Sequence, residues 1–330
     1  RQDSCIICGY ISVGTSLGRA RMNRLAFVLP EAVLNVKAHM RIRTILLQGS
    51  SVKSLTFLGD MFDGVQCPCI LLQLVATGKP LSTAGMMIED RTRTYTIAME
   101  RTVVPENFSF RMTDEEYRVL EKIKNSIPVC YLADHADFAL GIVTGNNKKF
   151  LSTEKTEHSE MVLKGTDICK YHINPAKQYL RFEPEQFQQV APLEIYRAPE
   201  KLLYRFISNQ LVVAYDDRQI LSLNSCNIVI PKIEGMQIKY ILAILNSSVS
   251  QFVYQKEFHS IKVLRAHMEH IPIPRVGKAI QNEIIAMTEP LICGMGKEAA
   301  ETCQKRLDGR IMDLFRLSAE EQWIIQHALH

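Results

Sequence analysis

The sequence predicts a mixed α/β (α+β) fold built from three consecutive parts. Residues 25–99 alternate short apolar runs with one amphipathic stretch, which is typical of strands packed with a helix. From residue 127, short β-prone segments are separated by Gly, Pro and Asn, which indicates a β-rich part with many turns. Residues 276–330 place Glu, Lys and Gln opposite apolar side chains, so this part is predicted to be helical.

Five elements are expected in the first part. The apolar run 25–30 ends at a proline, as a buried strand would, and 31–48 has apolar residues near helical spacing. Residues 51–58 alternate polar and apolar side chains, and 69–76 have the composition of a central strand. Residues 91–99 alternate Thr and Arg with apolar residues, which favours an edge strand.

Three further helices have recognisable signals. Residues 113–125 open with Thr113 and acidic residues, and Glu116 occupies the capping-box position, so we expect a helix that links the first part to the second. One continuous helix is expected over 237–255. Ser318 is expected to begin the last helix, because acidic residues follow it at once.

Length and composition exclude several classes of protein. The chain has 330 residues, of which 47% are apolar and 22% are charged, as in ordinary globular domains. The longest uncharged runs, 64–78 and 240–255, contain polar residues and are too short to span a bilayer. The start of the chain does not read as a signal peptide, so we expect no membrane association and a cytoplasmic location. The first residue is Arg1 rather than Met, which suggests a piece of a longer chain.

The nine cysteines predict free thiols in a reducing compartment, because their number is odd and their spacing is irregular. Cys5 and Cys8 form one Cys-x-x-Cys pair that could be half of a zinc site. No second pair follows at zinc-finger spacing, so we expect no bound metal.

The charge distribution favours an anionic partner. The net charge is +4, and residues 141–275 hold 17 basic and 13 acidic side chains, whereas the rest of the chain holds 22 of each. The whole excess therefore lies in one segment that is also rich in Tyr, Asn and His, which fits a surface for double-stranded DNA.

Common catalytic motifs are absent from the sequence. It has no Gly-x-Gly-x-x-Gly, no phosphate-binding loop and no His-Glu-x-x-His. Cys169 and His172 could suggest a thiol nucleophile, but ordinary surface or core residues explain them better. Asp216 and Asp217 could bind a metal, but a turn between two strands explains that pair better.

Several strings of the sequence, in this order, resemble the C-terminal part of adenine-N6 DNA methyltransferases of the Eco57I/TaqI type, from restriction–modification systems. They are FVLPEAVLNVKAHMRIRTILL, GIVTGNNKKFL, LKGTDICKYHI, KLLYRFISNQLVVAYDD, SLNSCNIVIP, YILAILNSSVSQFVYQKEFHSIKVLRAHMEHIPIP and LDGRIMDLFRLSAEEQWII. The resemblance covers nearly all of the chain beyond residue 24.

The resemblance implies four parts. Residues 1–110 would be the end of a Rossmann-like methyltransferase domain, and 111–126 a linking helix. Residues 127–275 would be a TaqI-like target-recognition domain, and 276–330 a helical extension.

Two motifs of the family are missing. The methyl-donor site needs a Gly-containing loop after the first strand, and the target adenine needs an Asn/Asp-Pro-Pro-Tyr/Phe loop. The nearest string here is Asn174-Pro175-Ala176-Lys177, which lacks the second proline and the aromatic residue. We therefore expect no cofactor and no methyl transfer in this chain. The parent enzyme would use S-adenosylmethionine, and Mg²⁺ if a nuclease is fused to it.

Two alternatives stay open. The chain could be a complete S-adenosylmethionine-dependent DNA methyltransferase whose motifs are unrecognised. It could also resemble a specificity subunit, with residues 276–330 docking a separate catalytic or restriction subunit.

The first group of candidate DNA-binding residues lies in one short string. It combines a glycine for close backbone approach, two amides that can read bases and two lysines for phosphates, although a solvated turn would have the same composition. The residues are Thr144, Gly145, Asn146, Asn147, Lys148 and Lys149.

The remaining candidates are basic, aromatic or amide side chains further along the chain. Arg205 could instead form an ion pair at the edge of the core, Asn224 could make an Asx turn, and the group after residue 255 could be a solvated face. They are Lys164, Lys170, Tyr171, Arg205, Asn224, Lys256, His259, Lys262, Arg265 and His267.

Overall fold

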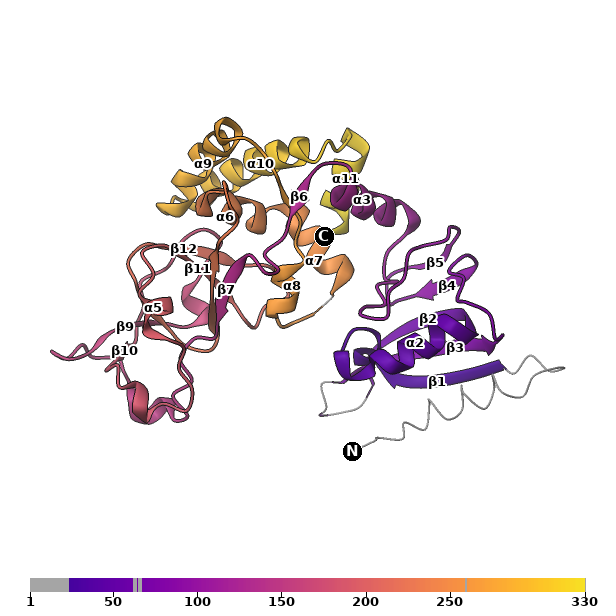
Figure 1. Cartoon of the computed structure of the whole chain (residues 1–330), viewed down its shortest axis with the longest axis horizontal. Coiled ribbons are helices and arrows are strands. Elements are labelled where there is room, and N and C mark those ends of the chain that lie inside the picture. Colours follow the sequence, from indigo (N-terminus) through magenta and orange to yellow (C-terminus); the bar gives the residue numbers. More distant parts are fainter. Residues whose placement is uncertain (1–23, 62–63, 65–66, 259, 330) are drawn as a thin grey trace. The chain divides into compact units, whose positions relative to one another are not determined.

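The computed structural model describes residues 24–61, 64, 67–258 and 260–329, which divide into two compact units (Figure 1). The first unit contains the described residues up to Arg118 together with Lys256–Phe258, and the second contains the others. The division falls within helix α3 (Asp114–Asn125). The expected mixed α/β fold is confirmed, with several sheets and helices. Cys5, Cys8 and His259 lie outside the described residues.

A five-stranded sheet forms the body of the first unit, with strand order β1-β3-β2-β4-β5. Its strands are β1 (Arg24–Pro30), β2 (Ser50–Asp60), β3 (Pro68–Ala76), β4 (Met86–Glu89) and β5 (Thr94–Ile97). Strand β3 is antiparallel to both β1 and β2, so these two run in the same direction on either side of it. Strands β1, β2, β3 and the edge strand β5 confirm the expected elements, whereas β4 was not expected.

The expected single helix over 31–48 is wrong. The stretch divides into η1 (Glu31–Leu34), η2 (Lys37–His39) and α2 (Met40–Gly49). The buried guanidinium of Arg43 donates to the carbonyls of Val33 at 2.7 Å and Val36 at 3.0 Å. Because these two carbonyls accept from the arginine, they do not take part in a regular series of α-helical hydrogen bonds. The chain therefore forms two short 3-10 helices before α2 begins.

The second unit contains two four-stranded sheets and a two-stranded ribbon. The first sheet is antiparallel, in the order β12 (Val213–Asp216), β11 (Lys201–Arg205), β14 (Cys226–Pro231) and β7 (Ala136–Ala139). The second has the order β13 (Leu221–Ser222), β9 (Glu160–Leu163), β10 (Tyr179–Leu180) and β8 (Leu151–Ser152). The ribbon pairs β6 (Val129–Cys130) with β15 (Ile273–Pro274). Apolar side chains of both four-stranded sheets share one core.

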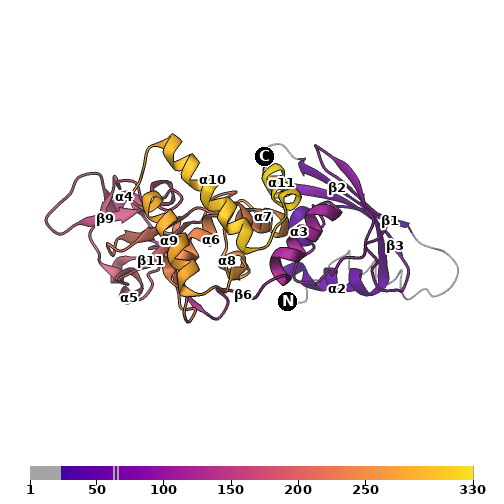
Figure 2. The same cartoon turned by 90° about the horizontal axis from the view of Figure 1, so that it is seen from above.

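Further helices follow strand β14 along the chain. They are α6 (Ile238–Asn246), α7 (Ser248–Glu257), α8 (Arg265–Glu269), α9 (Lys278–Ile292), α10 (Lys297–Leu314) and α11 (Ala319–Ala328). Helix α6 lies beside α9 (Figure 2) and also contacts strands β11, β12 and β14, which explains why its residues 240–246 are all buried. Among the described residues, no helix is long and apolar enough to cross a membrane.

The expected continuous helix over 237–255 is also wrong, because it is interrupted at Ser247. The side chain of Asn246 accepts from the backbone N–H of Val213 at 3.0 Å and donates to the carbonyl of the same residue at 2.8 Å. The Ser247 hydroxyl then accepts from the N–H of Ser250 at 3.2 Å, which starts α7 as an N-cap does. The starts expected at Thr113 and Ser318 are confirmed, because each hydroxyl accepts the third N–H of its helix at 3.3 Å.

A fully buried ion pair joins strands β11 and β12. The ammonium of Lys201 and the carboxylate of Asp216 are both 0% exposed and hydrogen-bonded to each other. Asp216 also accepts from the N–H groups of Arg218 and Ile220, each at 3.0 Å. The turn expected at the two adjacent aspartates is therefore present, and Asp216 holds it together.

We predict that Asp216→Asn lowers the free energy of unfolding by about 3–5 kcal/mol, because it leaves the Lys201 ammonium buried without a counter-charge. Urea unfolding followed by circular dichroism measures the change. The control is Asp217→Asn, which alters the exposed neighbour and should cost less than about 0.5 kcal/mol. Equal unfolding midpoints for the two variants would contradict this role of Asp216.

Candidate nucleic-acid interface

The string 144–149 comprises a short loop and most of the single turn α4 (Asn147–Phe150), and the whole string is called the loop 144–149 below. Gly145 has a φ of +75°, a left-handed conformation that glycine adopts without strain. Thr144 is buried, and its hydroxyl donates to the Asn147 side-chain oxygen at 2.6 Å. Asn146 caps α4 by accepting from the N–H of Lys149 at 3.3 Å. The loop is therefore a folded turn, and Lys148 and Lys149 project from it as exposed side chains.

Backbone hydrogen bonds connect this loop to other predicted binding residues. The N–H of Ile142 donates to the carbonyl of Ser222 at 2.7 Å, and that of Asn224 donates back to the carbonyl of Ile142 at 3.1 Å. The N–H of Leu223 reaches the carbonyl of Leu163 at 2.7 Å, directly before Lys164. The structure thus brings together three groups that are far apart in the sequence.

The same series of hydrogen bonds extends to Lys262. The N–H of Phe206 donates to the carbonyl of Ser225 at 3.0 Å, and the N–H of Val263 donates to the carbonyl of Phe206 at 2.8 Å. Ile207 and Lys262 form a β-bridge beside them. We call the connected segments 143–149, 163–165, 188–189, 223–225 and 260–263 the loop edge.

Sequence reasoning missed the glutamines of the loop edge, Gln188 and Gln189. Val143 and Gln189 exchange backbone hydrogen bonds of 2.9 and 3.1 Å, which places both glutamines beside the loop 144–149. Both side chains are exposed. Their residue type is a signal in the sequence, because glutamine can read bases, but the pairing with Val143 has no local signature.

The loop edge carries exposed positive charge. Lys148, Lys149 and Lys262 are exposed and Lys164 is half-buried, and none of the four forms an ion pair within the part of the chain that the structure describes. The Lys149 ammonium lies 4.5 Å from the centroid of the Phe150 ring. Such cations are available to neutralise phosphate groups.

Arg205 has internal hydrogen-bond partners. Its guanidinium donates to the carbonyl of Gly165 at 2.9 Å and also to the carbonyl of Ile168. A Cβ on Gly165 would lie only 2.6 Å from the carbonyl oxygen of Ser225, so glycine is required for this close approach. Arg205 therefore holds the turn that presents Lys164.

Lys170 and Tyr171 are also directed inwards. The Lys170 ammonium donates to the carbonyl of Asn246 at 3.2 Å, and burial lowers its pKa although the Asp308 carboxylate opposes this. Tyr171 is 2% exposed, and burial raises the pKa of its phenol well above the usual value. Lys170 therefore connects the turn after Ile168 to helix α6, and the backbone of Tyr171 bonds to that of Val213 in β12.

The predicted group after residue 255 divides into buried and exposed side chains. Lys256 is 8% exposed and clusters with the first unit, where its ammonium lies 2.9 Å from the Glu116 carboxylate. Arg265 is exposed, pairs with Glu269 at 2.7 Å and lies 5.2 Å from the ring centroid of Phe138. The DNA contacts expected of these residues stay predictions.

His267 is held neutral within α8. Its Nδ1 accepts from the N–H of Leu264 at 3.2 Å, and its ring lies 5.7 Å from that of Tyr254. Burial, with a smaller contribution from the charge of His270, lowers the pKa of His267 to about 4. At neutral pH this imidazole therefore adds no positive charge to the surface.

We predict a pH-dependent loss of stability from His267. Its folded pKa lies below the unfolded value, so the unfolded state binds the proton first and stability falls as the pH drops from about 6.5 towards 4. The slope from this group is at most about 1.4 kcal/mol per pH unit. His267→Gln should remove it, as urea unfolding at several pH values would show, whereas the exposed His158→Gln should retain it. Parallel pH profiles for His267→Gln and the wild type would contradict the prediction.

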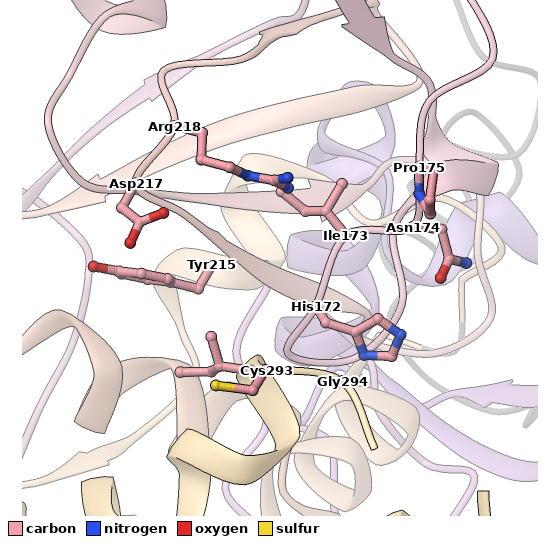
Figure 3. Close-up of a pocket in the computed structure, with 10 residues that line it drawn as sticks. His172, Ile173, Asn174, Pro175, Tyr215, Asp217, Arg218, Cys293 and Gly294 are labelled. Atoms are coloured by element: carbon pink, nitrogen blue, oxygen red, sulfur yellow. The ribbon is translucent and has the colours of Figure 1, made fainter. Parts of the chain in front are cut away.

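A pocket of about 420 Å³ lies elsewhere in the second unit (Figure 3). His172, Asn174 and Pro175 line one side, and Tyr215, Asp217 and Arg218 line the other. The N–H of Cys169 donates to the carbonyl of His172 at 3.0 Å, and the Cys169 thiol accepts from the Asn174 amide at 3.3 Å. Among the described residues, the thiol of Cys169 and the imidazole of His172 form no nucleophile–base pair. No group of three or more metal-binding side chains occurs in the described ranges.

Comparison with known proteins assigns part of the chain. Residues 160–273 match the family model of the TaqI-like C-terminal specificity domain. A stretch of 156 residues is 29% identical to the type II methyltransferase M.VspI of Vibrio sp. (strain 343), and this match covers 44% of the chain and 36% of that protein. The expected resemblance to methyltransferases with a TaqI-like specificity domain is confirmed.

A solved structure shares the fold. It is the type IIL restriction-modification enzyme MmeI in complex with DNA, which aligns over 97% of this chain and 50% of its own with a TM-score of 0.57 and 11% identity. At this identity the likeness concerns the fold alone. The chain thus spans half of the solved relative, and its match covers about a third of the curated one.

Proposed function

We propose that this chain is the DNA target-recognition module of a type II (IIG-like) restriction–modification enzyme that methylates adenine at N6. The observation that carries the proposal is the match of residues 160–273 to a specificity domain. The same unit contains the loop edge, whose amides are exposed and whose lysines form no ion pair with any residue that the structure describes. The DNA bound by the solved relative MmeI adds support.

The chemistry of the loop edge suits duplex DNA. Lysines without carboxylate partners can neutralise phosphates and set the position of the protein on the duplex. The amides of Asn146, Asn147 and Asn224 can donate to or accept from base edges. Because Arg205 and the Thr144 hydroxyl brace these turns from inside, the contacting side chains start from an ordered backbone.

The residues present do not fit a site for S-adenosylmethionine. The sequence contains no Asn/Asp-Pro-Pro-Tyr/Phe string and no Gly-x-Gly-x-x-Gly string. Asn174 and Pro175 belong instead to the pocket in the second unit. We therefore assign the cofactor, and Mg²⁺ for any fused nuclease, to the parent enzyme and no methyl transfer to this chain.

We assign the other parts of the chain by the same proposal. Residues 1–110 would be the end of a Rossmann-like methyltransferase domain, and the parallel directions of β1 and β2 around β3 support this. Residues 127–275 would recognise DNA, and 276–330 would meet a catalytic or restriction subunit. The seven described cysteines are all free, which supports a reducing, cytoplasmic setting.

The main alternative is a complete methyltransferase with unrecognised motifs. Titration calorimetry with S-adenosylmethionine separates the two, because measurable heat of binding would favour the alternative.

We predict that the double variant Lys148→Ala/Lys262→Ala weakens binding to every duplex. Each lysine removed should reduce the slope of log affinity against log salt by about 1. Fluorescence anisotropy with duplexes of different sequence, between about 50 and 200 mM salt, measures both effects. The control is Lys305→Ala, which removes an exposed lysine from α10.

The proposal is contradicted if the wild-type chain binds no duplex at low salt. It is also contradicted if Lys305→Ala reduces the slope as much as the loop-edge lysines do.

A further inference from the structure

The side chain of Gln188 lies next to Gly145, on the side where any other residue would carry its Cβ. A Cβ built on Gly145 would lie 3.3 Å from the Cβ of Gln188 and 3.5 Å from its Oε1, and these are its only contacts within 4 Å. Because Gly145 also has a φ of +75°, glycine suits this position on two counts. The absence of a side chain at Gly145 therefore leaves room for the side chain of Gln188 beside the loop 144–149.

The backbone on either side of Gln188 is fixed. Gln189 and Val143 exchange two hydrogen bonds of 2.9 and 3.1 Å, and Phe187 is buried among the rings of Phe150 and Phe182. Gln188 is thus an exposed residue between two anchored neighbours. The backbone at Gln188 therefore loses little conformational freedom when the side chain binds.

The side-chain amides on this surface differ in how many internal hydrogen bonds they already make. The Asn146 oxygen accepts from the Lys149 N–H, and the Asn147 oxygen accepts from the Thr144 hydroxyl. The Gln188 amide has no hydrogen-bond partner among the residues that the structure describes. The oxygen and the nitrogen of Gln188 are therefore both free of internal partners within the described ranges, whereas each asparagine oxygen already accepts one hydrogen bond.

We propose that Gln188 reads an adenine edge in the major groove of the DNA target. This inference rests on the proposed function. Adenine presents an N6 donor beside an N7 acceptor, which pairs with the oxygen and nitrogen of one amide, whereas guanine presents two acceptors. Lys148 and Lys149 are exposed on the neighbouring loop, where they can reach the phosphates that flank such a base.

The test selects bound duplexes from a random library with the whole chain and compares variants. The wild type should prefer adenine at one position, and Gln188→Ala should reduce that preference by about five- to 150-fold. Gln188→Glu presents only acceptors, so the preference should move towards cytosine, whose N4 is a donor. Thermal unfolding midpoints should be unchanged, since Gln188 is exposed.

Gln189→Ala tests the neighbouring glutamine of the loop edge as a competing reader. The matched control is Gln326→Ala, which removes an exposed glutamine of α11 that lies outside the loop edge. Its sequence preference should equal that of the wild type. If Gln188→Ala keeps the full preference, or if Gln189→Ala alone loses it, the assignment of Gln188 is wrong while the proposed function stands. If the wild type binds without sequence preference, the proposed function and this inference both fall.

Discussion

The buried ion pair of Lys201 and Asp216 is the constraint on which the second unit depends. Two charges at 0% exposure are tolerated only when they satisfy each other and their remaining hydrogen bonds. The Lys201 ammonium also donates to the carbonyl of Tyr196 at 2.7 Å, and Asp216 binds the turn that leads into β13. The ion pair therefore connects the sheet β12-β11-β14-β7 to the turn that enters β13, the first strand in the order of the other four-stranded sheet.

The same network continues to the loop edge. The Tyr196 hydroxyl donates to the carbonyl of Leu140 at 3.1 Å and accepts from the N–H of Ala191 at 3.1 Å. These two residues lie just before the loop 144–149 and just after Gln189, so a core interaction fixes both sides of the candidate surface. The surface lysines add little to stability and are free to serve binding. The residues that stabilise this unit, such as Lys201, Asp216 and Tyr196, are thus different from the surface lysines proposed to bind DNA.

The sequence predicted those elements whose signals are local. The apolar run at β1 and the caps at Thr113 and Ser318 were found because each depends on neighbouring residues only. The breaks before α2 and at Ser247 were missed, because they depend on hydrogen bonds that the side chains of Arg43 and Asn246 make with backbone outside their own helices. Local periodicity carries no information about such partners.

The candidate site shows the same division. Lys148 and Asn224 were singled out by residue type, and the structure places both on the loop edge. Arg205 and Lys170 were singled out in the same way, but they donate to internal carbonyls, which sequence cannot reveal. Gln188 was overlooked, because only the bridge between Val143 and Gln189 brings it to the loop.

The most direct test of the account is a lysine footprint of the chain with and without duplex DNA, read by acetylation and mass spectrometry. Bound duplex is expected to protect Lys148, Lys149 and Lys262 from acetylation, while the exposed Lys305 of α10 reacts equally in both samples. Unchanged reactivity of the three loop-edge lysines under conditions where the duplex is bound would contradict it.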